Sequence, residues 1–430
     1  MRTFTAYLVI LLAALAAAEK YAMVFGTADG WSNYSITSDP CRVYTDLIRA
    51  GIKPENIIYM TYTTDVNTSR NPYPGMIFTD PADNTDGDWA KYGCFDHVDY
   101  TDDEINEKVF LAILSGDAET VKEATGKENP KVLNAGPEDT VFTYFIDHGG
   151  DDIICVGGDY VRSAALVGAL KTAYEKKLYG KWVWFMEACH SGSMFPNLPT
   201  DINIYVMTSA DAHHNAYMSN CPPEDYIGEK HLGACMAGLW DNFYLDYLEQ
   251  NPDCTIGEIF DSVKASVAES SDQNVSEFGD MTFRDLKVSE FFGELPSRSL
   301  RKSYKVSKSE SNVPVSEVPL HLAKWAAIRA DDKNKESALK AYENELIAEA
   351  KREVELMRLG SALMNEKAAN NAMNAPSEAY SADCVRELSL MLVKKCGHKL
   401  PFSSKQNNML RNICLPGLSV PNVNWDDICM

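Results

Sequence analysis

The chain has 430 residues, of which 45% are hydrophobic, and a formal net charge of −22. This length accommodates a domain of 250 residues or more together with a second unit, and the apolar content is that of a globular protein. The negative charge argues against nucleic acid as a partner, because phosphates would repel such a surface. The charge is uneven: residues 1–296 carry 20 Lys and Arg against 46 Asp and Glu, whereas residues 297–430 carry 20 against 16. We therefore expect the basic C-terminal part to associate with the acidic body.

The amino terminus has the pattern of a secretory signal peptide, which we place at residues 1–18. Arg2 supplies a positive charge, residues 7–18 form a continuous apolar run, and small residues precede Glu19. The run is too short to favour a transmembrane anchor, and no later stretch approaches 18 apolar residues. We expect a secretory protein without a membrane anchor, found in lysosomes or other acidic vesicles or outside the cell.

Short apolar runs that alternate with helical patterns predict an α/β fold, with a mostly parallel sheet flanked by helices on both faces. The unit formed by a strand at 21–26, a helix at 40–50 and a strand at 56–61 requires parallel strands. Polar segments at 27–39 and 65–100 are predicted to be loops. Further strands are expected at 141–146, 181–187 and 202–207, and further helices at 103–114, 162–177, 233–249 and 255–267.

The composition changes near Pro296, so we place the first domain at 19–296. Residues 297–316 are rich in Ser, Lys and Arg and predict an exposed linker, which we extend to 332. Residues 333–430 are predicted to be an all-α unit. Its long helix carries an apolar stripe that the cysteine-rich segment after Asp383 is expected to cover. The stripe residues are Leu339, Tyr342, Leu346, Val354 and Met357.

The 11 cysteines fit an oxidising compartment, and their odd number leaves at least one thiol unpaired within the chain. Cys189 is our candidate for that thiol. The last 50 residues hold four cysteines that predict two disulfides in the C-terminal unit, and the spacing leaves their pairing open. These are Cys384, Cys396, Cys414 and Cys429.

Two predicted strands end in residues that together can perform nucleophilic catalysis. One strand is followed by His148, Gly149 and Gly150, and the other by Cys189. A thiol is mostly protonated at neutral pH, so it needs a base, and His148 can take its proton. The N–H groups of Gly149 and Cys189 can hold the oxyanion of a tetrahedral intermediate. His190 is a rival base, but on an extended backbone it points away from Cys189.

These strand ends, 41 residues apart, resemble those of the caspase-like cysteine peptidases, and several motifs are similar to those of the legumain family of asparaginyl endopeptidases. The resemblance covers nearly the whole chain and implies a caspase-like fold. The motifs are Asp147–His148–Gly149, residues 187–194, 197–199 and 202–205, residues 30–34, 71–75 and 114–119, and the four-cysteine tail.

The resemblance implies a cysteine endopeptidase made as a zymogen, with peptides and proteins as substrates. Cys189 would be the nucleophile, His148 the base, and Asn33 the residue that orients the imidazole. The C-terminal region would be an inhibitory prodomain that acid releases, and cystatin-type inhibitors are further partners that the resemblance suggests. Three sequons begin at Asn33, Asn67 and Asn274. We expect glycans only at Asn67 and Asn274, because a glycan on Asn33 would prevent its orienting role.

The chain departs from the family in the pocket that recognises the substrate's Asn side chain. The family has Arg and His after Asn–Tyr, where this chain has Ser35 and Ile36, and an Asp where it has Ala234. Glu187 is retained, so Glu187 and Ser35 are our candidate substrate-binding residues. Unpaired buried polar groups cost roughly 1–3 kcal/mol each, which is enough to change specificity. We therefore expect a preference other than Asn, such as a larger or basic side chain facing Glu187.

The autoprocessing site follows less directly from the family pattern. Alignment from Val318 places Arg329 near the family's cleavage position, and Asp331, Asp332 and Asn334 are alternatives. Cleavage after Arg329 would be consistent with a basic preference.

Three alternatives remain open. The catalytic subunit of the GPI-anchor transamidase shares these strand ends, but it would be expected to carry a membrane anchor. The same acyl-enzyme could be captured by an amine, which would make the protein a peptide ligase. A catalytically silent binding protein is the third alternative. No cofactor and no metal are expected, because the candidate His and Cys residues already have nucleophile and base roles and no ligand cluster has zinc spacing.

Overall fold

The structure, a computed structural model, describes residues 18–430 except 82–87, 296–306, 378, 418–419 and 421. The proposed signal peptide therefore lies outside the described residues, apart from Ala18. A six-stranded sheet forms the centre, in the order β13-β8-β7-β3-β1-β2. All neighbouring pairs are parallel except β13 with β8. The strands are β1 (Lys20–Gly26), β2 (Ile57–Thr61), β3 (Thr140–Ile146), β7 (Lys181–Glu187), β8 (Ile204–Thr208) and β13 (Ser276–Gly279).

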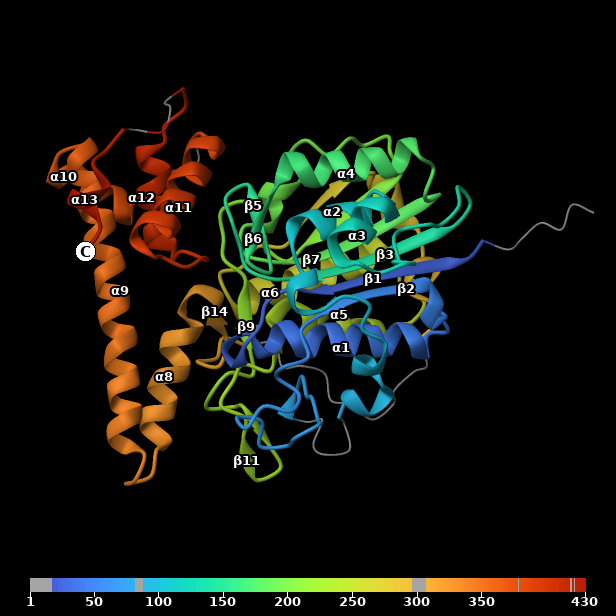
Figure 1. The fold of residues 1–430 in the computed structure, drawn as a ribbon, viewed down its shortest axis with the longest axis horizontal. Coiled ribbons are helices and arrows are strands. Elements are labelled where there is room, and N and C mark those ends of the chain that lie inside the picture. Colours follow the sequence, from blue (N-terminus) through green and yellow to red (C-terminus); the bar gives the residue numbers. More distant parts are fainter. Residues whose placement is uncertain (1–17, 82–87, 296–306, 378, 418–419, 421) are drawn as a thin grey trace, which may run out of the picture.

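The sheet is covered by helices on both faces (Figure 1). Neighbouring side chains of each strand point to opposite faces, so Val24 and Phe25 of β1 enter two different hydrophobic cores. One core holds α1 (Tyr34–Arg49), α5 (Leu239–Gln250), α6 (Ile256–Ser270) and α7 (Ser289–Phe292). The other holds α2 (Glu107–Leu114), α3 (Ala118–Thr125) and α4 (Ser163–Glu175). Continuous apolar strands are what such a doubly covered sheet requires, and the predicted α/β fold is confirmed.

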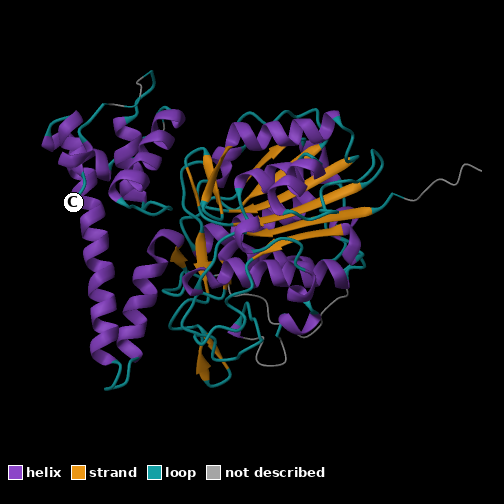
Figure 2. Ribbon diagram, in the orientation of Figure 1, coloured by secondary structure: helices purple, strands orange, loops and turns teal. Residues whose placement is uncertain are grey.

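Small strands lie outside the central sheet (Figure 2). A hairpin-like sheet joins β4 (Gly149–Gly150), β5 (Ile153–Val156) and β6 (Asp159–Arg162). A second sheet joins β12 (Ala237–Gly238), β9 (Tyr217–Ser219) and β14 (Val313–Pro314). A third pairs β10 (Tyr226–Ile227) with β11 (Lys230–His231). The second sheet brings a segment from beyond residue 306 against the main body.

The C-terminal region is helical, and in Figure 1 it stands beside the body as the orange and red helices. The hairpin of α8 (Val318–Arg329) and α9 (Lys335–Leu363) leads to a bundle with its own hydrophobic core. The bundle contains α10 (Glu366–Asn374), α11 (Ala382–Cys396), α12 (Ser404–Ile413) and α13 (Trp425–Ile428). Within the described residues, none of the helices is both long and apolar enough to span a bilayer.

Disulfides account for eight of the cysteines. Cys384–Cys414 and Cys396–Cys429 hold the C-terminal bundle, which confirms two disulfides there and supplies their pairing. The body contains Cys41–Cys94 and Cys221–Cys235. Cys189 is free, as predicted, together with Cys155 and Cys254, and all three are buried.

The prediction of a polar loop at 27–39 is wrong for its second half, because α1 begins at Tyr34 and contains Pro40. Pro40 lacks an N–H, so the carbonyl of Ile36 has no helical donor. A Cβ at Gly26 would lie 2.3 Å from that carbonyl oxygen, so glycine is needed for β1 to pass this close. Proline therefore marks an inner turn of the helix rather than its start.

The prediction of an exposed linker at 297–316 is wrong for its last residues. We call residues 311–318 the covering segment, because Ser311, Val313, Val315 and Val318 are buried. The segment pairs with β9 in an antiparallel ladder, which its serine-rich composition did not indicate.

The apolar stripe on the long helix is only partly covered. The bundle packs on Leu356 and Leu359, whereas the stripe residues Leu339 and Leu346 remain 43% and 42% exposed. The cysteine-rich segment reaches only the C-terminal end of α9, so the expectation that it covers the whole stripe is wrong.

Candidate active site

The structure brings His148 and Cys189 together at the edge of the sheet. His148 follows β3 and Cys189 follows β7, and the register of these parallel strands places Ile146 beside Glu187. A Cβ on Gly149 would lie 2.3 Å from the carbonyl oxygen of Cys189. Glycine is therefore required after His148, because any side chain there would collide with the backbone of Cys189.

Asn33 contacts the imidazole of His148. Asn33 ends a short 3-10 helix before α1, and its Oδ1 lies 3.0 Å from Nε2 of His148. Its amide nitrogen donates to the carbonyl of Asp29 at 2.8 Å, which fixes the oxygen toward the imidazole. An amide oxygen only accepts, so Nε2 carries the proton and Nδ1 keeps its lone pair. Nδ1 is buried and has no partner among the described residues.

Burial keeps the thiol and the imidazole neutral in this state. It lowers the pKa of His148 to about 4 and raises the pKa of the Cys189 thiol well above its ordinary value. The thiolate is the nucleophile, so a thiol with a raised pKa beside an imidazole with a lowered one is a poorly activated pair. Burial of the site therefore favours the thiol over the thiolate.

Cys189 is not exposed, although the sequence placed it at a turn beyond the strand. Only 1% of its surface is accessible, because Val313, Val315 and Val318 of the covering segment pack in the same hydrophobic cluster. Sγ accepts a hydrogen bond from the N–H of Ala216 at 3.3 Å. The thiol therefore lies beyond the end of the strand, as the sequence predicted, but the covering segment buries it.

A cleft of about 840 Å³ runs past the site. On the body, Asn33, His148, Ser35 and Met218 line it. The covering segment and the C-terminal region supply the other wall, with residues such as Val315, Leu322, Arg352 and Gln406. Segments from both parts of the chain therefore form one cleft.

The two candidate substrate-binding residues occupy different positions. Ser35 lines the cleft, and its hydroxyl donates to Sδ of Met218 at 2.9 Å. Glu187 is fully buried, and neither carboxyl oxygen has a hydrogen-bond partner among the described residues. Burial and the neighbouring Asp241 raise the pKa of Glu187 well above its ordinary value. Burial therefore disfavours its charged form, and Glu187 is not among the described residues that line the cleft.

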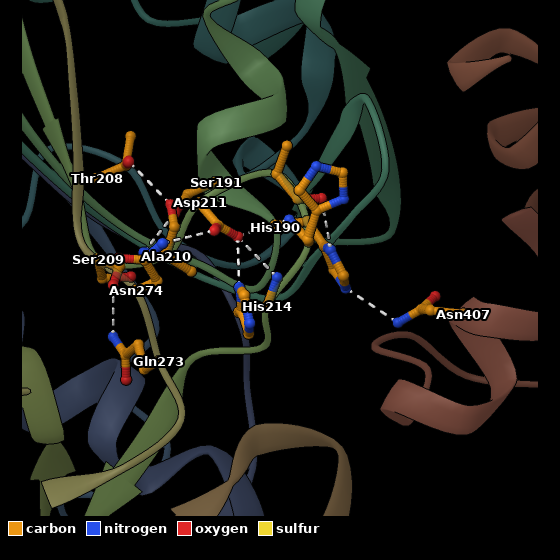
Figure 3. Close-up of polar contacts among 12 residues, drawn as sticks. His190, Ser191, Thr208, Ser209, Ala210, Asp211, His214, Gln273, Asn274 and Asn407 are labelled. Atoms are coloured by element: carbon orange, nitrogen blue, oxygen red, sulfur yellow. Dashed lines mark hydrogen bonds and ion pairs between the residues drawn. The ribbon is translucent and has the colours of Figure 1, made fainter. Parts of the chain in front are cut away.

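His190 lies outside the thiol–imidazole pair and faces the C-terminal region (Figure 3). It adopts a left-handed backbone with φ of 56°, which turns its side chain toward α12. Its Nε2 accepts from the amide of Asn407 at 3.0 Å, and its Nδ1 lies 3.0 Å from the carbonyl oxygen of Ala212. The sequence suggested His190 only as a rival base. Its contact with the C-terminal region had no signal in the sequence beyond the basic charge of that region.

A buried ion pair lies next to His190. The guanidinium of Arg411 is 2.9 Å from Oδ1 of Asp151, and both side chains are almost inaccessible. The hydroxyl of Tyr380 donates to the same oxygen at 2.6 Å. Arg386 also pairs with Asp152, on the edge of the body. Basic residues of the C-terminal region thus contact acidic residues of the body, as the charge distribution predicted.

The two glycosylation candidates are exposed. In Figure 3 the amide of Asn274 donates to Asp211 at 2.8 Å, and the imidazole of His214 contacts the same carboxyl group. Asn67 lies in the loop after β2. Glycosylation at both positions stays a prediction.

One group of potential metal ligands occurs in the C-terminal bundle. Nε2 of His398 lies 2.6 Å from Oε2 of Glu355, and Cys396 is close to both. The sulfur of Cys396 is bonded to Cys429, so it cannot act as a thiolate ligand. The remaining carboxylate–imidazole contact is explained by a hydrogen bond within the bundle.

Comparison with known proteins agrees with this chemistry. The sequence model of the peptidase C13 family matches residues 20–294. Hemoglobinase of Schistosoma japonicum is 29% identical over 417 residues, covering 94% of this chain and 91% of that protein. Legumain of Mus musculus is 32% identical over 316 residues, covering 73% and 68%. Caspase-1 of Spodoptera frugiperda is similar with a TM-score of 0.38 and 9% identity, over 66% of this chain and 92% of that one. The chain belongs to the peptidase C13 family and is a cysteine peptidase.

Proposed function

We propose that this chain is the zymogen of a legumain-type endopeptidase, with Cys189 as nucleophile, His148 as general base and acid, and Asn33 as the positioning residue. The observation that carries the proposal is the 3.0 Å contact between Asn33 Oδ1 and His148 Nε2, at the end of the strand next to the one that carries Cys189. This contact selects the tautomer whose Nδ1 can accept a proton.

In the proposed reaction, Nδ1 of His148 takes the proton of Cys189 and the sulfur attacks the carbonyl carbon of the scissile bond. The N–H groups of Gly149 and Cys189 hold the oxyanion. The tetrahedral intermediate then collapses, the C–N bond breaks, and His148 gives its proton to the leaving amine. Water, deprotonated by His148, cleaves the thioester and releases the acid. An amine in place of water would give a new peptide bond, which is the ligase alternative.

We propose that residues 333–430 act as an inhibitory prodomain, joined by the linker and activation peptide at 297–332 to a peptidase domain at 19–296. Support comes from the burial of Cys189 under the covering segment and from the ion pair between Arg411 and Asp151. Acid would weaken these charged contacts by protonating the carboxylates of the body. Cleavage near Arg329, with Asp331, Asp332 and Asn334 as alternatives, would then separate the two parts.

The family resemblance makes cleavage after Asn the default, and we propose that this chain has moved away from it. The support is the loss of polar partners at Ser35, Ile36 and Ala234. Four disulfides and similarity to legumain support a secretory protein that works in a lysosome, another acidic vesicle or the extracellular space. Peptides are its substrates, and a cystatin-type inhibitor is a further proposed partner.

The test is labelling with an iodoacetamide probe before and after incubation at acidic pH, together with casein cleavage. We expect labelling and cleavage to appear only after acid treatment and to disappear in Cys189→Ala. Cys254→Ala removes another buried free thiol and is the matched control, which should label and cleave as the parent does. Absence of both signals in the acid-treated parent would leave the catalytically silent alternative.

A further inference from the structure

The covering segment lies across the site as an added strand. β14 pairs with β9 in antiparallel register, with Val313 opposite Met218 and Pro314 opposite Tyr217. Beyond the strand, the N–H of Cys221 donates to the carbonyl of Ser311 at 3.1 Å, which extends the pairing. An extended peptide added to an exposed strand is a common way in which proteins recognise peptides, with main-chain hydrogen bonds for affinity and side-chain pockets for specificity.

The pairing places Val315 next to the nucleophile. The N–H of Val315 donates to the carbonyl of Ala216 at 2.9 Å, and the N–H of the same Ala216 donates to Sγ of Cys189 at 3.3 Å. Ala216 therefore contacts both the thiol and the segment. Val315 is 6% exposed and belongs to the same apolar cluster as Cys189. Among the residues of the segment, Val315 has the position that a substrate residue before the scissile bond would take.

The wall around Val315 is apolar. Met218 is buried, lines the cleft and packs with Val313 and Val315. The hydrogen bond from Ser35 to Sδ of Met218 holds the thioether in place and uses the hydroxyl that a polar substrate side chain would need. Glu187 is not among the described residues that line the cleft, and burial raises the pKa of its carboxyl group. None of the described residues of the body that line the cleft carries a carboxyl group that could bind a cation.

We propose that residues 313–315, Val–Pro–Val, are a built-in pseudosubstrate, and that this peptidase prefers a small β-branched apolar residue, valine above all, immediately before the scissile bond. Met218 and Ser35 determine this specificity. The inference rests on the proposed function and names its substrate class.

The segment escapes cleavage because of the structure that follows it. Residues Val315–Glu317 form a 3-10 turn, and α8 begins at Val318. A substrate must stay extended on both sides of the bond for the sulfur to approach its carbonyl carbon. The helical turn instead coils the chain directly after Val315, while Val318 still packs in the same cluster as Cys189. A flexible peptide with the same three residues is free of this restraint and becomes a substrate.

The first test uses acid-activated enzyme and fluorogenic amides of acetyl-Val-Pro-X, with X as Val, Ala, Asn, Arg or Asp. One methylene in an apolar pocket changes kcat/KM by roughly 10–200-fold, so Val should exceed Ala, Asn and Arg by about 10-fold or more. Highest activity with Asn or Arg would overturn the inference while leaving the peptidase intact. Loss of casein cleavage and of Cys189 labelling would instead refute the proposed function.

The second test changes the wall. Met218→Ala should reduce the Val-to-Ala ratio of kcat/KM at least about fivefold and improve substrates with larger side chains, because a larger cavity contacts valine less well. Met281→Ala, at an exposed methionine, is the matched control and should keep the parent's ratio. An unchanged ratio in Met218→Ala would show that another residue selects the substrate.

A synthetic peptide of residues 309–316 provides an independent measurement. The peptide should compete with substrate for the activated enzyme. A second peptide with Asn in place of the valine at position 315 should have an inhibition constant about 10-fold higher. Equal inhibition by both peptides would contradict the assigned position of Val315.

Discussion

Nη2 of Arg411, on α12, lies 3.0 Å from Nδ1 of His190 on the body. Nε2 of His190 accepts from the amide nitrogen of Asn407, so the proton of the neutral imidazole is on Nδ1, which faces the carbonyl of Ala212 beside the guanidinium. A second proton on the imidazole would place two donors face to face at Nε2 and two positive charges side by side. The C-terminal region therefore binds the neutral form of His190.

The first prediction concerns pH. Burial lowers the pKa of His190 in the covered state and Arg411 lowers it further, whereas Asp151, Asp211 and the hydrogen bond to Ala212 oppose this. An uncovered His190 would have a pKa of about 6.5. Because the pKa of His190 is lower in the covered state, the covered state is stabilised at pH values above about 6.5. This stabilisation is lost as the pH falls below about 6.5. Below this value, protonation of the uncovered imidazole weakens the association of the C-terminal region with the body. The association constant falls by up to about 10-fold for each pH unit, until the covered imidazole is protonated as well.

Replacement of His190 by Gln removes this titration and should move the pH at which Cys189 becomes reactive to a lower value. The rate of labelling by an iodoacetamide probe, measured from pH 7.5 to 4, checks it. His97→Gln, at an exposed histidine far from the C-terminal region in sequence and packed on Tyr44, is the control and should leave the midpoint unchanged. If the parent, His190→Gln and His97→Gln all have the same pH midpoint of labelling, release of the C-terminal region depends on carboxylates alone.

The second prediction concerns the ion pair between Arg411 and Asp151. Arg411→Ala removes the cationic partner of the buried carboxylate and leaves it the hydroxyl of Tyr380, at a cost of about 3–5 kcal/mol to the covered state. We expect casein cleavage at neutral pH without acid treatment. Arg162→Ala breaks an exposed ion pair with Glu387, worth about 0–1 kcal/mol, and should stay inactive at neutral pH. If both variants stay inactive, the ion pair does not hold the prodomain.

The third prediction tests the positioning role of Asn33. Asn33→Ala should lower kcat/KM of the activated enzyme about 100-fold, because the imidazole loses the partner that fixes its tautomer. Asn33→Asp keeps an oxygen acceptor and should recover a large part of the activity, with a pH–rate profile shifted toward higher pH by the added negative charge. Equal losses with unchanged profiles in the two variants would mean that Asn33 only supports the local fold.

The fourth prediction concerns the glycine beside the nucleophile. Gly149→Ala introduces a Cβ 2.3 Å from the carbonyl oxygen of Cys189, so the backbone that would hold the oxyanion must move. Activity should fall at least about 100-fold, the effect of losing one oxyanion donor. Gly168→Ala is the control: this exposed helical glycine has open space around it and should retain full activity. Retained activity in Gly149→Ala would remove Gly149 from the site.

The main features of the fold could be predicted because they depend on local patterns. The apolar runs before His148 and Cys189 could only be buried strands, and the order of the chain placed their ends at one edge of the sheet. The same logic identified the thiol and the imidazole. Recognition of Asn33 needed the family resemblance, because 115 residues separate it from His148.

The contacts across the cleft could not be predicted in the same way. Val313 and Val315 stand in a serine-rich stretch without strand periodicity, and only pairing with β9 makes them a strand. Met218 has no pattern that marks it as a pocket residue, and His190 gains its environment from Asn407 and Arg411 on a distant helix. These positions are determined by long-range packing, which overrides local propensity.

Arg329, the proposed cleavage position, ends α8 with its guanidinium 2.8 Å from the buried carboxyl group of Asp225, in the loop closed by Cys221–Cys235. An enzyme that prefers valine would leave this cut to another peptidase, and a cut after Arg329 would leave the ion pair and the β14–β9 ladder unbroken. Nicking of the chain and exposure of the thiol are therefore two separate events. A protein that runs as two fragments under denaturing conditions will still be latent until the covering segment dissociates.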